Sequence, residues 1–171
     1  TADDVTYVRE MFVSVPDRVL VIHIAASKPG MISLRASLDG RDDYYDDNRP
    51  CIDYENMMLY TGASGSRDGI FFAAALTGTA EGGSIRTVGG SLVIANANEA
   101  TLLLSVGTSF YHGESYEDAA KLDASYAADC SYEELLSRHL SDYQEKFRRV
   151  LFTRPDNSEG GSALPTDERL K

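Results

Sequence analysis

The sequence is rich in acidic side chains, but few of them stand in an arrangement that indicates chemistry. It holds 27 Asp and Glu residues, so pairs that could act as general acid and base arise by chance. Glu10, beside Arg9 in an extended segment, is expected to be a surface or cross-strand charge. Glu133 and Glu134 are explained by helix capping and the helix dipole. We therefore assign no catalytic residue.

The run Asp42-Asp43-Tyr44-Tyr45-Asp46-Asp47 has three interpretations. Its oxygens could bind Ca²⁺, but the spacing is not that of an EF-hand, which needs ligands at fixed alternate positions around a central Gly. Tyr44 and Tyr45 could contact a sugar, with Tyr54 as a further aromatic candidate nearby. The run could also be a solvated loop. We keep Tyr44 and Tyr45 as candidate substrate-binding residues and assign no metal ligand and no cofactor.

The histidines and possible nucleophiles give no catalytic motif. His23 lies in an apolar strand and is expected to be a satisfied core residue, whereas His139 is expected at a packing or interface position. His112 lies in the loop FYHGES and is the least constrained. Ser64 lacks both the G-x-S-x-G elbow and the G-K-[ST] of a phosphate loop. The sequence has no CxxC, HExxH or GxGxxG, so zinc and dinucleotide sites have no support.

Charge and cysteine content exclude several classes of partner. The net charge is −11, which argues against nucleic acid or an anionic membrane because phosphates would be repelled. No run reaches the roughly 18 apolar residues of a membrane helix, and the polar start TADD is no signal peptide. Cys51 and Cys130 could pair only within about 7 Å Cα to Cα, so we expect free thiols.

Two strands joined at Pro16-Asp17 organise the chain. Residues 5–14 alternate in polarity and are typical of a half-buried strand. Residues 19–24 are apolar except for His23, which predicts a strand covered on both faces. Because Pro cannot donate a ladder hydrogen bond, the break falls between the two runs.

Further strands follow at regular spacing and predict a mainly β fold. They alternate with turn signals such as Gly89-Gly90, a two-residue hairpin, and with a long acidic loop at 39–56. About eight strands by Gly107 predict an antiparallel sandwich or barrel. The expected strands are 5–14, 19–24, 31–38, 57–61, 69–77, 84–88, 91–96 and 100–106, with a last one at 151–154.

Two helices are predicted after the strands. An alanine-rich segment from Ser115 to Ala128 is the first. Ser131 and Glu134 form a capping box that opens the second. One stripe at helical spacing runs along the second helix, made of Tyr132, Leu135, Leu136, Leu140, Tyr143, Phe147 and Val150. Residues 156–163 are a Gly/Ser-rich linker.

Five segments in order carry a resemblance to a known family. They are YVREMFVSVPDRVLVIHIAASKPGMISLRASLD, DGIFFAAAL, EGGSIRTVGGSLVIANANEATLLLSVGTSF, SYEELLSRHLSDYQEKFRRV and LPTDERL. Together they resemble the N-terminal β-domain and helical linker of glycoside hydrolase family 95, the α-L-fucosidases. The resemblance implies a β-supersandwich whose linker leads to an (α/α)6 barrel that hydrolyses terminal α-L-fucosides with inversion. The family's catalytic residues lie in that barrel, and none falls on this sequence.

The resemblance implies a non-catalytic fragment of a bacterial enzyme. Its expected parts are a β-sandwich at 1–110, a helical linker at 111–150, and a short strand with a flexible tail at 151–171. The chain alone is expected to be inactive and to support the barrel. Expected partners are fucosylated glycans through the parent enzyme, the barrel, and a second copy through exposed strand edges. The parent is expected to be secreted, periplasmic or cytoplasmic.

Two alternatives remain open at this point. The chain could be a self-standing carbohydrate-binding module, or a protein-interaction sandwich unrelated to sugars. The helix stripe also has two interpretations. It could pack wholly on the sheet, or, following the resemblance, one flank could dock on the barrel and be exposed here.

Overall fold

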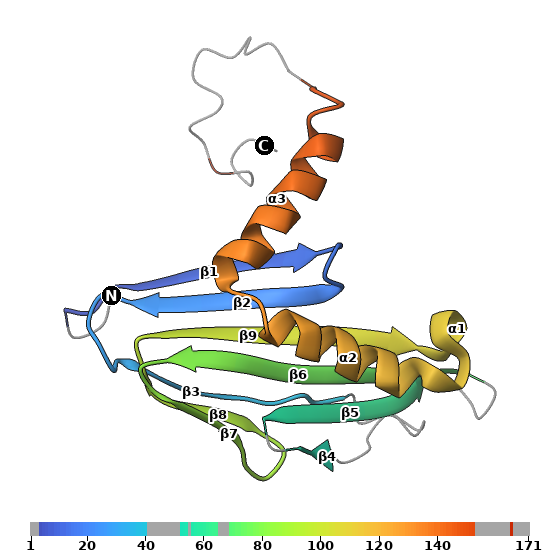
Figure 1. The fold of residues 1–171 in the computed structure, drawn as a ribbon, viewed down its shortest axis with the longest axis horizontal. Helices are drawn as coiled ribbons and strands as arrows, with labels where there is room; N and C mark the ends of the chain where they lie inside the picture. Colours follow the sequence, from blue (N-terminus) through green and yellow to red (C-terminus); the bar gives the residue numbers. More distant parts are fainter. Residues whose placement is uncertain (1–3, 41–51, 55, 65–68, 153–164, 166–171) are drawn as a thin grey trace.

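The described part of the chain is a two-sheet antiparallel sandwich followed by helices (Figure 1). The computed structural model describes residues 4–40, 52–54, 56–64, 69–152 and 165. The larger sheet has the order β1-β2-β9-β6-β5-β4 and the smaller β3-β8-β7, which confirms the predicted fold. The strands are β1 (Tyr7–Ser14), β2 (Val19–Ala26), β3 (Ile32–Ala36), β4 (Ile52–Asp53), β5 (Met57–Ser64), β6 (Ile70–Glu81), β7 (Ser84–Thr87), β8 (Leu92–Ala97) and β9 (Glu99–Thr108).

The core between the sheets is built from alternating apolar positions. Leu92 and Ile94 of β8 pack against Met58 and Leu102 of the larger sheet, and all four are buried. Strand β2 contributes to both sides of its sheet. Ile22 packs on this core, while the alternate positions of β2 face the helices. The predicted strand with two covered faces is confirmed.

The prediction for β1 is wrong for most of the strand. It is an edge strand that pairs only with β2 in the described structure, and Val8, Met11 and Val13 are 51%, 69% and 58% exposed. The smaller sheet packs on Tyr7 at one end, and Phe12 packs under the helices. An alternating pattern fixes which side chains share a face but not what covers that face. This edge is where the proposed pairing with a second copy would form.

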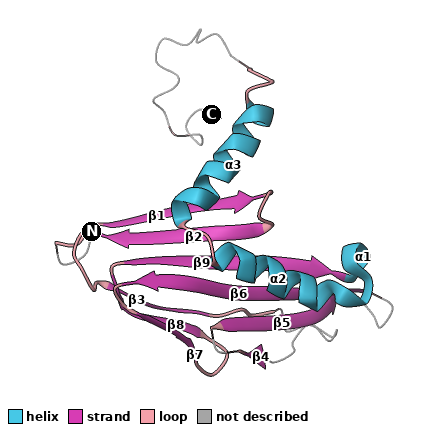
Figure 2. Cartoon of the chain, viewed as in Figure 1, coloured by secondary structure: helices cyan, strands magenta, loops and turns pink. Residues whose placement is uncertain are grey.

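Helix α2 lies across the other face of the larger sheet (Figure 2). The predicted helix is α2 (Tyr116–Ala128), preceded by α1 (Ser109–His112) and a 3-10 turn (Gly113–Ser115) that the sequence did not predict. Ala120 and Ala124 pack on Ala73 and Ala75 with all four side chains buried. Small residues on both surfaces let the helix approach the sheet closely.

Helix α3 (Tyr132–Phe147) begins on the sandwich and then leaves it. Ser131 and Glu134 form the predicted capping box, with reciprocal hydrogen bonds of 2.9 and 3.2 Å. Leu135 is fully buried against Val19 and Val21. Beyond this first turn α3 projects past β1 (Figure 1). Helix α3 ends at Phe147, and residues 148–152 are not helical.

Three further predictions about elements need correction. The loop predicted at 39–56 includes the two-residue strand β4, which pairs with β5. Strands β5 and β6 are longer than expected. Leu151 and Phe152 have no regular secondary structure, and the rest of the strand predicted at 151–154 lies outside the described residues. Short elements and strand ends depend on partners that local sequence does not specify.

Helix α2 approaches strand β9 so closely at Gly107 that a larger side chain should not fit there. A Cβ added at Gly107 would lie 2.1 Å from the carbonyl oxygen of Tyr116. We expect Gly107→Ala to lower the free energy of unfolding by about 1–3 kcal/mol, the usual cost of overpacking. Gly89→Asn is the control, because Gly89 has open space and a φ of +55° that Asn tolerates. Equal urea midpoints for Gly107→Ala and the wild type would contradict the account.

Candidate functional site

The turn between β1 and β2 holds both long helices through ion pairs. Arg18 donates from Nε and Nη2 to the two carboxylate oxygens of Asp123 in α2, at 2.7 and 2.5 Å. Next to it, Asp17 accepts from Nε of Arg138 in α3 at 2.8 Å. Planar two-point contacts between guanidinium and carboxylate fix orientation as well as distance. The turn therefore sets the positions of α2 and α3 relative to the sheet.

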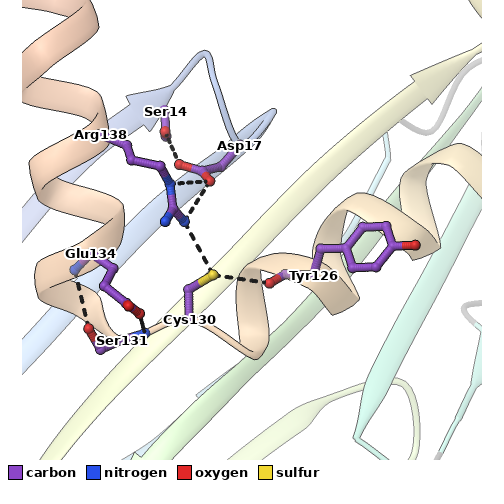
Figure 3. A network of polar contacts seen from close by, with 7 residues as sticks. All are labelled: Ser14, Asp17, Tyr126, Cys130, Ser131, Glu134 and Arg138. Carbon is purple, nitrogen blue, oxygen red and sulfur yellow. Dashed lines mark hydrogen bonds and ion pairs between the residues drawn. The ribbon is translucent and has the colours of Figure 1, made fainter.

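Asp17 is the centre of a small polar network at the junction of the helices (Figure 3). Its side chain is 12% exposed, and it also accepts a hydrogen bond from the Ser14 hydroxyl. Arg138 donates a second bond to Sγ of Cys130 at 3.2 Å, and Cys130 bonds to the Tyr126 carbonyl. The hydrogen bond that Arg138 donates to Asp17 raises the pKa of Arg138. Cys130 is a free thiol, and Cys51 lies outside the described residues.

A continuous row of rings leads from the sandwich out along α3. Phe12 of β1 lies 6.1 Å from Tyr132 and 4.7 Å from His139 between ring centroids. His139 stacks on Tyr143 at 5.5 Å, and Tyr143 on Phe147 at 5.2 Å. These three residues stand four apart, the spacing that places side chains over one another on a helix. We call His139, Tyr143 and Phe147 the α3 aromatic face.

The α3 aromatic face becomes exposed as the helix leaves the sandwich. Tyr143 is 48% and Phe147 65% exposed, and Val150, Leu151 and Phe152 beyond the helix are more exposed still. Lys146 pairs with Asp142 within α3, and Arg149, just beyond the helix, pairs with Glu145. Aromatic rings gathered on one exposed face are typical of an interaction site. The interpretation that the whole stripe packs on the sheet is therefore wrong from Leu140 onward.

The described structure includes one of the three tyrosines that the sequence suggests as sugar contacts. Tyr44, Tyr45 and the acidic run around them lie outside the described residues. Tyr54 is 42% exposed, and its backbone bonds to Met57 and to the Thr87 hydroxyl. The structure thus places one of the three candidate tyrosines, at the surface near β7.

The histidines and Glu10 lie largely as the residue patterns indicate. His23 is 7% exposed and bonded to Thr101, as expected of a satisfied core histidine. His139 is a packing residue, and His112 is exposed at the end of α1. Glu10 accepts a hydrogen bond from Tyr132 at 2.9 Å, so this charge on β1 contacts helix α3. No local pattern in the sequence indicates this pairing across 122 positions.

The described residues contain no metal-binding cluster and no membrane-spanning helix. No group of three or more His, Cys, Asp or Glu side chains among them could hold a metal ion, and no helix there is long and apolar enough to cross a membrane. A pocket of about 480 Å³ lies against Tyr60 and Phe72. Asp39 is the one carboxylate among the described residues that line it, so it presents no acid–base pair.

Replacement of Arg138 should weaken the attachment of α3 to the turn between β1 and β2. Arg138→Met leaves the poorly exposed Asp17 without its charged partner, which typically costs about 1–3 kcal/mol. We expect this loss in urea unfolding. The matched control is Arg149→Met, whose partner Glu145 is 68% exposed; an exposed pair contributes at most about 1 kcal/mol. Equal losses in the two variants would show that Asp17 does not anchor the helix.

The Tyr132 phenol should lose its proton at a higher pH than an ordinary tyrosine does. Burial, and then the hydrogen bond to Glu10, raise the pKa of Tyr132 to about 12 from 10.0. Because the folded state keeps this proton longer than the unfolded chain, its contribution to stability is full below pH 10 and falls as the pH rises through 12. We expect Glu10→Gln to lower this pKa in an NMR titration, whereas Glu145→Gln should leave it unchanged. A pKa that does not respond to Glu10→Gln would contradict the assigned contact.

Comparisons with known proteins agree with a carbohydrate-enzyme domain. The chain is 29% identical to "Alpha-L-fucosidase 2" of Arabidopsis thaliana over 202 aligned positions, covering 98% of this chain and 23% of that protein. A "Putative kojibiose phosphorylase from human microbiome" has a similar fold, with a TM-score of 0.60, 13% identity, and coverage of 84% of this chain and 22% of that one. The chain therefore spans less than a quarter of each.

The part of the chain that matches a known protein family includes the whole sandwich. Residues 1–113 match the family described as "Glycosyl hydrolase family 65, N-terminal domain". The matched region contains every strand of the two sheets and ends just before α2. The chain is thus an N-terminal domain of a glycoside hydrolase, and it belongs to the glycosyl hydrolase family 65 N-terminal domain family.

Proposed function

We propose that this chain is the non-catalytic N-terminal domain of an α-L-fucosidase-like enzyme of family 95 type, in which α3 docks on the catalytic part. In this proposal the complete enzyme hydrolyses terminal α-L-fucosides with inversion, and the domain supports the catalytic barrel. The fucoside class is supported by the identity to the Arabidopsis fucosidase and by the family resemblance of the five segments. The proposed bacterial origin rests on that resemblance alone.

The observation that carries the proposed role is the exposed α3 aromatic face. Phe147 and the apolar residues 150–152 that follow it are each at least 65% exposed. Burial of one large apolar side chain stabilises a protein by about 1.5–3 kcal/mol, so such a row is costly to leave in water. The ion pair between Asp17 and Arg138 holds α3 in place while leaving this face exposed. A partner that covers these side chains fits this arrangement better than a helix end that stays exposed to water.

The pocket beside His23 supports a role outside catalysis. Retaining and inverting glycosidases place two carboxyl groups about 5–9.5 Å apart on either side of the scissile bond. This pocket holds Glu81, Glu99 and Glu133, and its volume is about 200 Å³. Ligand pockets are typically about 300–1,000 Å³, so this pocket does not accommodate a sugar on each side of a bond.

Paired substitutions on α3 test the proposal. Tyr143→Ser with Phe147→Ser should lower the stability of the protein encoded by the complete gene by about 2–4 kcal/mol, as loss of interface anchors does. The same pair should be nearly neutral in the present chain, where both rings are exposed. The control is Glu145→Ser with Arg149→Ser, which has the same spacing on the charged side. Thermal unfolding of all four proteins is the measurement.

Hydrolysis of nitrophenyl α-L-fucoside completes the experiment. The complete protein should release nitrophenol, and the purified 171-residue chain should release none. Turnover by the chain alone would refute the proposed role. Equal effects of Tyr143→Ser with Phe147→Ser in the chain and in the complete protein would show that nothing docks on α3. A complete protein that is stable but inactive on fucosides would refute the substrate class and leave the docking role standing.

A further inference from the structure

Strand β1 forms an edge of the larger sheet along its whole length. Among the described residues it pairs with β2 alone, and the register runs one to one from Tyr7 to Ser14. Edge strands that stay in water are usually protected from further pairing by Pro, by bulges or by several charged side chains. Strand β1 has no Pro, and Arg9 and Glu10 are its only charged residues. Its edge is therefore suited to pairing with another strand.

The backbone hydrogen bonds of β1 show which of its residues face this edge. The N–H of Ser27 donates to the carbonyl oxygen of Thr6 at 2.9 Å, so the backbone groups of Thr6 point toward β2. In an antiparallel pair, residues that bond to the partner strand alternate with residues that do not. The residues whose N–H and C=O groups point away from β2 are thus Tyr7, Arg9, Met11 and Val13. We call these backbone groups the open edge of β1.

Apolar side chains are exposed on both faces of β1. Val8, on the face that contacts α3, is 51% exposed. Met11 and Val13, on the face toward the smaller sheet, are 69% and 58% exposed. A strand that is covered on both faces is apolar at nearly every position, as β2 is. A strand beside β1 that covered these side chains would share this property.

Helix α3 passes over the middle of β1 and continues beyond the edge (Figure 1). Its contacts with β1 include the 2.9 Å hydrogen bond from Tyr132 to Glu10 and the stacking of His139 on Phe12 at 4.7 Å. Four residues advance a helix by about 6 Å, and neighbouring strands lie about 4.7–4.9 Å apart. Tyr143, four residues after His139, therefore lies over the position that a strand added beside β1 would take.

We propose that an extended segment of the complete protein, outside these 171 residues, pairs with the open edge of β1 and lies under the α3 aromatic face. The inference rests on the proposed function, in which a partner covers that face, and it gives the form of the partner at the contact. Backbone hydrogen bonds to β1 supply the affinity, and side chains at alternate positions supply the specificity. One face of the added strand contacts Val8 and Tyr143 and the other contacts Met11, so the strand is apolar on both faces.

A second copy of the chain, expected from the sequence, fits this edge less well. Two copies related by a two-fold axis would pair β1 with β1 in antiparallel orientation. Each copy would bring its own α3 over the middle of the paired strands, where the two helices would compete for the same space. A segment of the same polypeptide brings no second α3. The present chain spans less than a quarter of each of the two proteins that it resembles, so a longer polypeptide has ample length to supply one strand.

Residue-resolved hydrogen–deuterium exchange tests the pairing, because the outward and inward amides of β1 alternate. The amides of the open edge should exchange at least about ten-fold more slowly in the complete protein than in the 171-residue chain. The intervening amides, such as that of Glu10, bond to β2 and should be protected in both proteins, which makes them the internal control.

Each outcome of this exchange experiment decides a different point. Equal exchange of the open edge in both proteins, with α3 protected in the complete one, would overturn the strand pairing and leave the docking of α3 standing. Unprotected amides in both the open edge and the outer part of α3 would overturn the proposed function as well. Protection of the open edge in the chain alone, together with a dimer in light scattering, would assign the edge to a second copy.

Two substitutions at Met11 separate backbone pairing from side-chain packing. Met11→Pro removes an N–H of the open edge, and Pro is tolerated on an edge strand when its N–H side faces outward. Met11→Thr removes the same apolar side chain and keeps the N–H. In the complete protein, Met11→Pro should raise the exchange of the other open-edge amides by about ten-fold, whereas Met11→Thr should change it little. Both variants of the chain alone should unfold as the wild type does, and equal exchange in the two complete variants would overturn the backbone pairing.

Discussion

The ion pairs made by the turn between β1 and β2 determine where the helical part of this domain lies. Asp17 and Arg18 are neighbours in sequence, yet one binds α3 and the other α2. The carboxylate of each pair is nearly buried, with side-chain exposures of 12% and 10%, where attraction between charges is stronger than in bulk water. Because the turn ends an edge hairpin, α3 leaves the sandwich beside that edge.

The two helices use this anchorage differently. Helix α2 lies flat on the sheet because Ala120, Ala124 and Gly107 leave room for close contact. Helix α3 keeps only its first turn in the core, through Leu135, and its rings continue outward from there. Helix α2 is thus part of the packed sandwich, whereas the outer part of α3 projects from it with its apolar side exposed to solvent. This division matches a domain that covers less than a quarter of each of the two proteins that it resembles.

Local patterns predicted much of this arrangement, and long-range contacts account for what they missed. The two covered faces of β2 and the capping box of α3 follow from residues within a few positions of one another. The edge position of β1 does not, because its alternation is the same whether or not a layer covers it. The contacts of Asp17 and Glu10 join residues more than 100 positions apart. The exposed half of the α3 stripe is apolar in sequence, so only the arrangement in space shows that it is uncovered.

The central claim is that the α3 aromatic face is a covered interface in the complete protein. Hydrogen–deuterium exchange of the amides in α3 tests it most directly, measured in this chain and in the product of the complete gene. The account predicts fast exchange around Tyr143 and Phe147 in the chain alone, and strong protection of the same amides in the complete protein. Equal exchange in both would contradict it, since α3 would then remain uncovered.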